Sequence, residues 1–264
     1  MNVLIINLPP STDRLAFQKK QLKRLGIAFN VLKATSILDI SQFDIQNLSL
    51  GWERPLRAVE LACFLSHKKA WQYVVDKNKP ILILEDDALL SMHAKELLLE
   101  LDKQMHLDLV TLEVRGRKKI VSKKEVVLND SKHKLFELYQ DRTGAAGYVL
   151  WPSGANKLLK KTLSKPPGLA DAFISSCYSL SAYQVEPAAL IQLDQCENYN
   201  IFNSHKTSSS ISSQKKPTNR KCDLLEYFIF KYRRIHSQFK MGLRHVSVIW
   251  SSHRRNISIE PDYF

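Results

Sequence analysis

Three consecutive carboxylates, Glu85, Asp86 and Asp87, directly follow the aliphatic run 80–84 in "PILILEDDALLS". Adjacent carboxylates repel one another, and a low-dielectric site makes them costly unless something compensates their charge. Their hard oxygens suit Mg²⁺ or Mn²⁺, which need few protein ligands because water and substrate phosphates complete the coordination shell. The alternative is a strand that ends at the surface, with its first loop residues in water. Both interpretations stay open on these residues alone.

The segments around the acids predict an α/β sheet. "VLIINL" (3–8) is a short apolar run typical of a buried strand, and "STDRLAFQKKQLKRLG" (11–26) has the polar start, apolar spacing and glycine stop of an amphipathic helix. "IAFNVLKA" (27–34) predicts a second strand. Because a crossover helix joins parallel strands, this order favours a parallel sheet. A largely buried helix over 58–75 then leads into the acidic strand.

Further strands and helices follow along the chain. Residues 107–114 predict a strand, 117–140 a polar hairpin or excursion, and 143–163 a small-residue loop, a strand and a helix. A helix is expected near Ala170, and 182–193 looks extended. In an open parallel sheet, ligands bind beyond the carboxyl ends of the strands, which is where the three acids stand.

Charge is concentrated in the tail. The 264 residues carry a net +13, and residues 214–255 contain eleven Lys or Arg against only Asp223 and Glu226. This distribution predicts that one end of the molecule meets a polyanionic surface. With 44% hydrophobic residues, the chain can also bury a substantial core.

Cysteine spacing and the N-terminus predict the compartment. The four cysteines fall into no CxxC or Cys/His pattern, which argues against a disulfide framework or structural zinc. "MNVLIINLPPSTDR" has no basic leader, its apolar run is too short for a signal peptide, and no run reaches membrane-spanning length. We expect a cytoplasmic protein, peripheral on the cytoplasmic face of the inner membrane.

The last part of the chain predicts a polar linker and an amphipathic helix. Residues 204–221 are serine-rich and predict a mobile linker. The following segment places one apolar stripe on a helix, formed by Leu224, Leu225, Phe228, Tyr232, Ile235 and Phe239. Such a helix either docks on the core or lies on anionic lipid. Both hold together if the stripe packs on protein and the cations face lipid.

Five blocks occur in a family-specific order: "VLIINLPPSTDRLAF", "AVELACFLSHKKAWQ", "PILILEDDA", "TGAAGYVLWPSGANKLL" and "PPGLADAFI". In order and approximate spacing, residues 1–200 resemble glycosyltransferase family 25, which includes bacterial lipooligosaccharide glycosyltransferases and collagen galactosyltransferases. The resemblance implies a GT-A-like, Rossmann-like, mostly parallel sheet flanked by helices. We expect this domain over 1–203, the linker over 204–221 and a basic helical extension over 222–264.

The resemblance also implies an inverting transfer from a UDP-hexose, with a divalent cation, Mn²⁺ or Mg²⁺, held by the acidic motif. Asp87 matches the last acid of the motif and is the expected metal ligand. Glu85 or Asp86 would contact the ribose, a metal-bound water or the metal. His205 is the candidate for completing the site from a late loop.

Four more residues match the family blocks on the donor side. Asn7 and Arg14 belong to the "INL…R" block, where an arginine can meet the nucleotide. Ser66 and His67 belong to the "LSH" block on the helix before the acidic strand. The alternatives are a solvent-facing helix cation for Arg14 and a buried histidine satisfied by a backbone carbonyl for His67.

An inverting transfer needs a base that removes the proton of the acceptor hydroxyl. Asp171, in "GLADAF", is the matching acid, and the alternative is that it only caps a helix. The "TGAAG" loop would let a sugar approach the backbone, or it serves close sheet packing.

The predicted function is transfer of galactose from UDP-galactose, with a β linkage, to the oligosaccharide of a lipooligosaccharide or lipopolysaccharide. UDP-glucose is the alternative donor. A different class, a metal-dependent nucleic-acid-binding protein or nuclease, is suggested by the charge and the acidic motif, but no recognised nucleic-acid module is present. The expected partners are therefore the donor, the glycolipid acceptor and an anionic membrane, and no nucleic acid.

Overall fold

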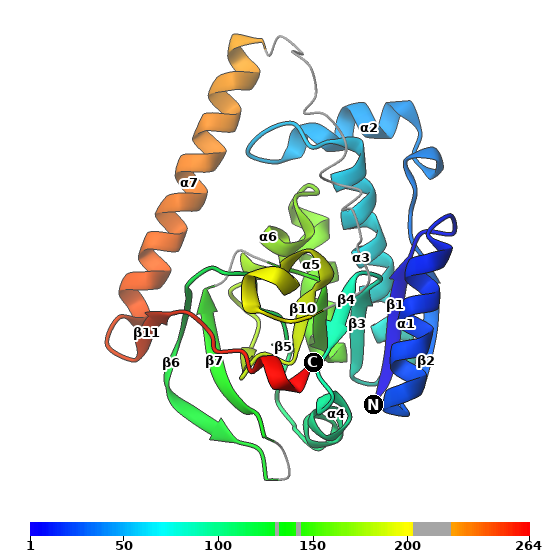
Figure 1. Ribbon diagram of the computed structural model, residues 1–264. Helices are drawn as coiled ribbons and strands as arrows, with labels where there is room; N and C mark the ends of the chain where they lie inside the picture. The colour runs from blue at the N-terminus through cyan, green and yellow to red at the C-terminus, as the bar shows by residue number, and fades with distance from the viewer. Residues whose placement is uncertain (130–131, 141–143, 203–222) are drawn as a thin grey trace.

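A computed structural model describes residues 1–129, 132–140, 144–202 and 223–264 (Figure 1). The predicted linker 204–221, and His205 within it, lie outside the described residues. Nine strands form one sheet in the order β11-β6-β7-β9-β5-β8-β3-β1-β2, and helices lie on its two faces. The predicted α/β class, with helices flanking the sheet, is confirmed.

The half of the sheet that carries the acids is parallel. β1 (Asn2–Asn7) pairs in parallel with β2 (Phe29–Lys33) on one side and β3 (Ile81–Glu85) on the other. Helix α1 (Thr12–Leu25) joins β1 to β2 and ends at Gly26, whose φ of 63° is left-handed. Since Ile6 lies opposite Glu85, the ends of β1 and β3 meet at one edge.

The other half is mixed. β8 (Gly147–Leu150) runs antiparallel between β3 and β5 (Leu109–Thr111), and β9 (Ala182–Glu186) runs parallel to β5. β6 (Lys119–Val127) and β7 (Lys134–Gln140) form the predicted hairpin. β7 joins it to β9, and β11 (Ser252–Arg255) adds to the free edge of β6.

A second, two-stranded sheet braces the residues that follow the acids. β4 (Ala88–Leu90) pairs antiparallel with β10 (Leu190–Gln192), so the chain after Asp87 is a strand and not a loop. Two buried glutamines of α1 complete this structure: Gln18 and Gln21 donate to the carbonyl of Ala88, and Gln21 accepts the N–H of Leu90. These side chains satisfy backbone groups that β4 would otherwise bury unpaired.

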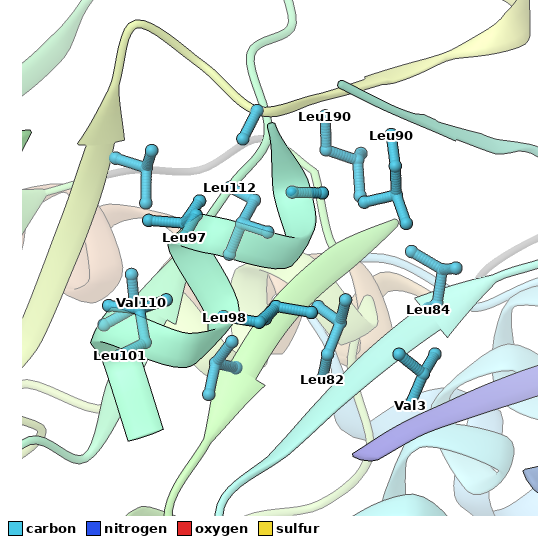
Figure 2. Packing of buried hydrophobic residues seen from close by; sticks show 14 of the residues in the cluster. Val3, Leu82, Leu84, Leu90, Leu97, Leu98, Leu101, Val110, Leu112 and Leu190 are labelled. Carbon is cyan, nitrogen blue, oxygen red and sulfur yellow. The ribbon is translucent and has the colours of Figure 1, made fainter. Parts of the chain in front are cut away.

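Strand alternation separates two cores, one on each face of the sheet. Val3, Leu82, Leu84 and Val110 face α1 and α4 (Ala94–Asp102), where they pack with Leu97, Leu98 and Leu101, as Figure 2 shows. The neighbouring residues Leu4, Ile6 and Ile83 point to the opposite face. They pack there with α3 (Ala58–Lys77), α5 (Pro152–Ser164) and α6 (Ala170–Ser175). This period-2 alternation fixes which side chains reach the edge of the sheet.

Residues 37–57, between β2 and α3, contain short helices. η1 (Ile37–Asp39), α2 (Gln42–Leu48) and η2 (Ser49–Gly51) precede α3. Glu60, in the first turn of α3, accepts hydrogen bonds from Arg54 and Arg57. Burial alone would raise the pKa of Glu60, but these bonds outweigh it and lower the pKa to about 2.

The C-terminal helix α7 (Leu224–Val248) runs along the β6–β7 side of the molecule (Figure 1). Its buried residues are Phe230 and Val248, whereas the predicted apolar stripe is exposed, with Phe228 62% and Phe239 63% accessible. The stripe therefore does not pack on the described protein, so core docking and lipid binding do not coexist in the way that the sequence allowed. Helical geometry puts Arg233 and Arg244 on the protein side together with the two buried residues. No helix in the described residues is long and apolar enough to cross a bilayer.

Candidate functional site

Asp86 is fully engaged by neighbouring side chains. Its Oδ2 accepts a 2.8 Å hydrogen bond from Asn7 at the end of β1, and its Oδ1 accepts a 3.0 Å bond from Arg14 on α1. Burial raises the pKa of Asp86, and the bonds from Arg14 and Asn7 oppose that shift. Arg14 is thus an ion-pair partner within the acidic cluster and not a solvent-facing helix cation.

Glu85 is oriented by a buried relay from α3. His67 Nε2 lies 3.0 Å from Glu85 Oε1, and His67 Nδ1 lies 2.9 Å from the Tyr148 hydroxyl. Trp71 donates its indole N–H to that hydroxyl, so the tyrosine proton can go to Nδ1 and the imidazole proton to Nε2. Burial raises the pKa of Tyr148, which keeps its proton in place. The alternative, in which a backbone carbonyl is the partner of His67, is therefore wrong.

Asp87 is the least compensated of the three acids. Arg14 Nη1 lies 3.8 Å from its Oδ2, and the amide of Gln192 lies 3.5 Å from its Oδ1. Burial, and then the charge of Glu85, raise the pKa of Asp87 to about 7. Its backbone is fixed, because its carbonyl accepts the N–H of Leu193 at 2.9 Å. The position is therefore rigid while the carboxylate lacks a close cation.

A divalent cation fits this arrangement. The side chain of Gln192 reaches Glu85 as well as Asp87, and its Oε1 is buried with no hydrogen-bond partner. A cation beside Asp87 would relieve the carboxylate repulsion that raises the pKa of Asp87, and rotation of the Gln192 amide would turn its oxygen, in place of Nε2, toward that cation. These oxygens are the hard donors that Mg²⁺ and Mn²⁺ prefer.

A second possible ligand set is less suitable. Ligand atoms of Cys63, His67 and Glu85 lie within 4.8 Å of one another. Both ring nitrogens of His67 already make hydrogen bonds, and burial holds the pKa of the Cys63 thiol well above its ordinary value. A metal there would need a thiolate and would break the relay that orients Glu85.

Ser66 has a role within the fold. Its hydroxyl accepts the backbone N–H of Thr35 at 2.8 Å and donates to the carbonyl of Ala62 at 2.8 Å. This bond ties the chain after β2 to α3, one residue from His67. Ser66 therefore stabilises the position of α3 next to His67. The residues that the structure brings together are Asn7, Arg14, His67, Glu85, Asp86 and Asp87.

Asp171 lines a pocket next to this cluster. It stands in the first turn of α6, and its Oδ1 accepts the N–H of Ala172 at 2.7 Å. Thr111, Tyr139, Tyr148 and Arg244 line the same pocket. After burial, the charges of Glu85, Asp171 and Asp87 raise the pKa of the Cys63 thiol, so all three carboxylates act on this group. Asp171 therefore faces a pocket in addition to bonding its own helix.

Two site residues were missed by the sequence prediction. Glu113 is buried, and its Oε2 accepts the N–H of Ala146 while its Oε1 has no partner. Burial, and then the charge of Glu85, raise its pKa to about 8. It lies near the end of the predicted strand 107–114, and an acid at the carboxyl end of a strand is a signal that could have identified it. Gln192 carries no comparable signal, because its place depends on the pairing of β10 with β4.

Gly144 explains the small-residue loop. Its φ is +87°, and an added Cβ would lie 2.4 Å from the Glu113 carboxyl group. Only glycine fits there, so this part of the "TGAAG" segment serves close packing around Glu113.

Fold and site together define an α/β protein with an acidic, cation-compatible site at the carboxyl edge of parallel strands. The model of glycosyltransferase family 25, described as an LPS biosynthesis protein family, matches residues 1–174. The chain belongs to this family and is a glycosyltransferase, the first of the two classes that the sequence had suggested.

Relatives include bacterial and animal members. The lacto-N-neotetraose biosynthesis glycosyltransferase LgtE of Neisseria gonorrhoeae is 30% identical over 204 residues, 71% of this chain and 72% of the relative. The lipooligosaccharide biosynthesis protein lic2B of Haemophilus influenzae is 29% identical, covering 72% and 76%. Procollagen galactosyltransferase 1 of Danio rerio is 30% identical over 67% of this chain, but the match spans only 31% of that protein.

Proposed function

We propose that this glycosyltransferase transfers a hexose from a UDP-sugar to the oligosaccharide of a bacterial lipooligosaccharide or lipopolysaccharide, with galactose as the first choice and glucose as the alternative. The observation that carries the donor site is Asp87, a rigidly held carboxylate without a close cation beside Glu85 and Gln192. The relatives support this choice of acceptor, because LgtE is a lacto-N-neotetraose biosynthesis glycosyltransferase and lic2B is a lipooligosaccharide biosynthesis protein.

In this proposal, Asp87 holds a divalent cation with help from Glu85 and Gln192. When bound, that cation would stabilise the negative charge that develops on the leaving diphosphate. Asp86 keeps Arg14 and Asn7 in place at the ends of α1 and β1. Arg14 then presents a cation at the same edge, where it can approach a donor phosphate.

Asp171 is the proposed base for inversion at the anomeric carbon. Its carboxylate borders a pocket that Tyr148, a member of the relay behind Glu85, also lines. The carboxylate would take the proton of the acceptor hydroxyl as the sugar is attacked from the opposite face, which gives a β-linked product.

Transfer assays with UDP-galactose and UDP-glucose, with Mn²⁺ or with a chelator, test the donor and the cation. We expect cation-dependent turnover that Asp87→Ala abolishes. Asp76→Asn is the matched control, because it removes an exposed carboxylate near the C-terminal end of α3, nine residues beyond His67. Absence of cation-dependent turnover with every UDP-hexose would overturn the proposal.

The exposed stripe of α7 supports membrane binding as part of this function. Large apolar side chains face outward along the helix, and Lys231, Arg234 and Lys240 are also exposed. A helix of this kind lies in the lipid interface, with its apolar side chains in the acyl boundary and its cations near anionic headgroups. The positive tail makes an anionic leaflet the favoured partner, and we place the protein on the cytoplasmic face of the inner membrane.

Vesicle sedimentation tests this surface. The double variant Phe228→Ser/Phe239→Ser should lose binding to vesicles rich in anionic lipid, whereas Phe43→Ser, an exposed apolar residue on α2, should bind as the wild type does. Deleting the tail is a poorer test, because β11 would leave the edge of β6. Unchanged vesicle binding together with a stable dimer that the double variant dissolves would assign the stripe to a second copy of this chain.

A further inference from the structure

The pocket beside Asp171 contains an unusual cation. Arg244 comes from α7, and its guanidinium carbon lies 5.5 Å from the ring centroid of Tyr139 and 5.8 Å from that of Tyr178. The two rings and the guanidinium all line the pocket. Aromatic faces hold a guanidinium by cation–π attraction without neutralising its charge.

Arg244 lacks an anionic partner. In the described part of the chain it forms no ion pair, and its Nε is buried with no hydrogen-bond partner. The other arginines near this face are compensated differently: Arg255 pairs with Glu186, and Arg233 donates to the carbonyls of Leu50 and Trp52. A half-buried arginine with an unsatisfied N–H is costly unless a ligand completes it.

Two carboxylates lie nearby and are otherwise engaged. Asp171 accepts the N–H of Ala172, and Glu137 accepts the hydroxyl proton of Tyr139 at 3.0 Å. The pocket therefore has a carboxylate at one side, two tyrosine rings in its wall and an uncompensated guanidinium from α7. A neutral sugar would leave that guanidinium without an anion.

We propose that this pocket is an acceptor subsite for a sugar that carries an anionic substituent, a phosphate or a carboxylate, which Arg244 binds. This inference rests on the proposed function, because it takes Asp171 as the base for the acceptor hydroxyl. The planar guanidinium matches two oxygens of either anion, and the rings of Tyr139 and Tyr178 offer apolar faces to the sugar. In this arrangement Arg244 binds the anionic group, and Asp171 accepts the proton of the reacting hydroxyl.

Binding without donor tests the subsite separately from catalysis. Methyl glucoside, glucose 6-phosphate and glucuronic acid are titrated by calorimetry against the wild type, Arg244→Gln and Arg244→Lys. Arg234→Gln is the matched control. It removes the same charge from an exposed position on the same helix. We expect the wild type to prefer an anionic sugar over the neutral one, and Arg244→Gln to lose about 10- to 100-fold of that preference. Arg244→Lys should retain part of it, since it keeps the charge but not the planar fork.

The two anions separate the sources of the charge. Preference for glucose 6-phosphate identifies a phosphorylated acceptor sugar, and preference for glucuronic acid identifies an acidic one. Equal affinity of the wild type for all three sugars would overturn the subsite. So would an Arg244→Gln variant that weakens all three equally, because the arginine would then only support the fold.

Transfer kinetics separate acceptor from donor. With soluble acceptors that differ only in the anionic group, Arg244→Gln should raise the KM for the charged acceptor and leave the KM for the UDP-sugar unchanged. The assignment would be overturned if Arg244→Gln raised the KM for the UDP-sugar and left the ratio of the KM values for charged and neutral acceptors unchanged. Arg244 would then bind the donor diphosphate. If the wild type transfers no hexose but binds the anionic sugar through Arg244, the proposed function fails and the anion site stands.

Discussion

The acidic edge at the ends of β1 and β3 and the pocket under α7 carry opposite uncompensated charges. At the edge, Asp86 and Glu85 have close partners, and Asp87 is left without a close cation. In the pocket, Arg244 lies between two aromatic rings and is left without an anion. A buried charge without a close partner is costly, so these two groups indicate where a cation and an anion from outside the chain would bind.

The largest expected effect separates Asp87 from its neighbour Asp86. Asp87→Asn should lower kcat/KM by about 10²- to 10³-fold, because it removes the proposed ligand of the cation that would stabilise charge on the leaving diphosphate. Its thermal stability should rise at pH 8 without added cation, since a carboxylate whose pKa is raised to about 7 destabilises the native state once ionised. Calorimetry of the metal-free protein and steady-state kinetics check both parts.

Asp86→Asn should behave in the opposite way with respect to stability. It removes the closer of the two carboxylates that pair with Arg14 at a partly buried position, which costs about 1 to 3 kcal/mol. Equal losses of stability in the two variants would contradict the distinction drawn between a compensated and an uncompensated acid.

The second prediction concerns the relay behind Glu85. Tyr148→Phe leaves the indole N–H of Trp71 and one nitrogen of His67 without a partner in the core, which should cost about 2 kcal/mol of unfolding free energy. Since Glu85 loses its orientation only indirectly, activity should fall by about 10- to 100-fold, less than for Asp87→Asn. Urea unfolding and kinetics measure the two effects. Full activity would show that Glu85 needs no support from α3.

The same contrast explains which parts of the site the sequence could predict. The acids, Asn7 and Arg14 stand at the ends of elements with clear periods, so their meeting at one edge follows from a parallel sheet. Tyr148, the relay partner behind His67, comes from β8, whose antiparallel insertion between β3 and β5 no local pattern indicates. Pairing over long sequence separations decides such contacts, and periodicity within one segment does not contain them.

Helix α7 was predicted as an element, but its orientation was not. Helical spacing identified the apolar stripe, yet both faces of the helix carry large side chains, and a single helix does not indicate which face meets the protein. The buried positions Phe230 and Val248 and the inward Arg244 lie outside the predicted stripe. The packing of α7 against its own domain therefore had to come from the structure.

The third prediction concerns the pH dependence of the unfolding free energy, to which Glu113 and Asp87 contribute. Both pKa values are raised in the native state, to about 8 and about 7, so the native protein holds protons that the unfolded chain releases near pH 4. Unfolding free energy should therefore fall as pH rises from about 5 to about 8, by roughly 2 to 4 kcal/mol. Denaturant titrations across this range measure it.

Glu113→Gln tests the origin of that slope. An amide keeps the shape of the protonated carboxyl group and cannot ionise, so the fall in stability with pH should become shallower. Glu125→Gln, on the exposed hairpin, should leave the slope unchanged. A Glu113→Gln variant with the full wild-type slope would show that Glu113 is ionised in the native protein.

The smallest expected effect belongs to the outer face of α7. Phe228→Ser/Phe239→Ser should change the unfolding free energy by less than about 0.5 kcal/mol per site, because both rings are exposed, whereas Phe64→Ala in the core should cost about 3 to 5 kcal/mol. Kinetics with soluble acceptors should also stay unchanged, since Arg244 lies on the opposite face of the helix. A large loss of stability would mean that the stripe packs on protein in solution. The outer face of α7 would then be an interface of the folded chain and not the membrane-binding counterpart of the inner face.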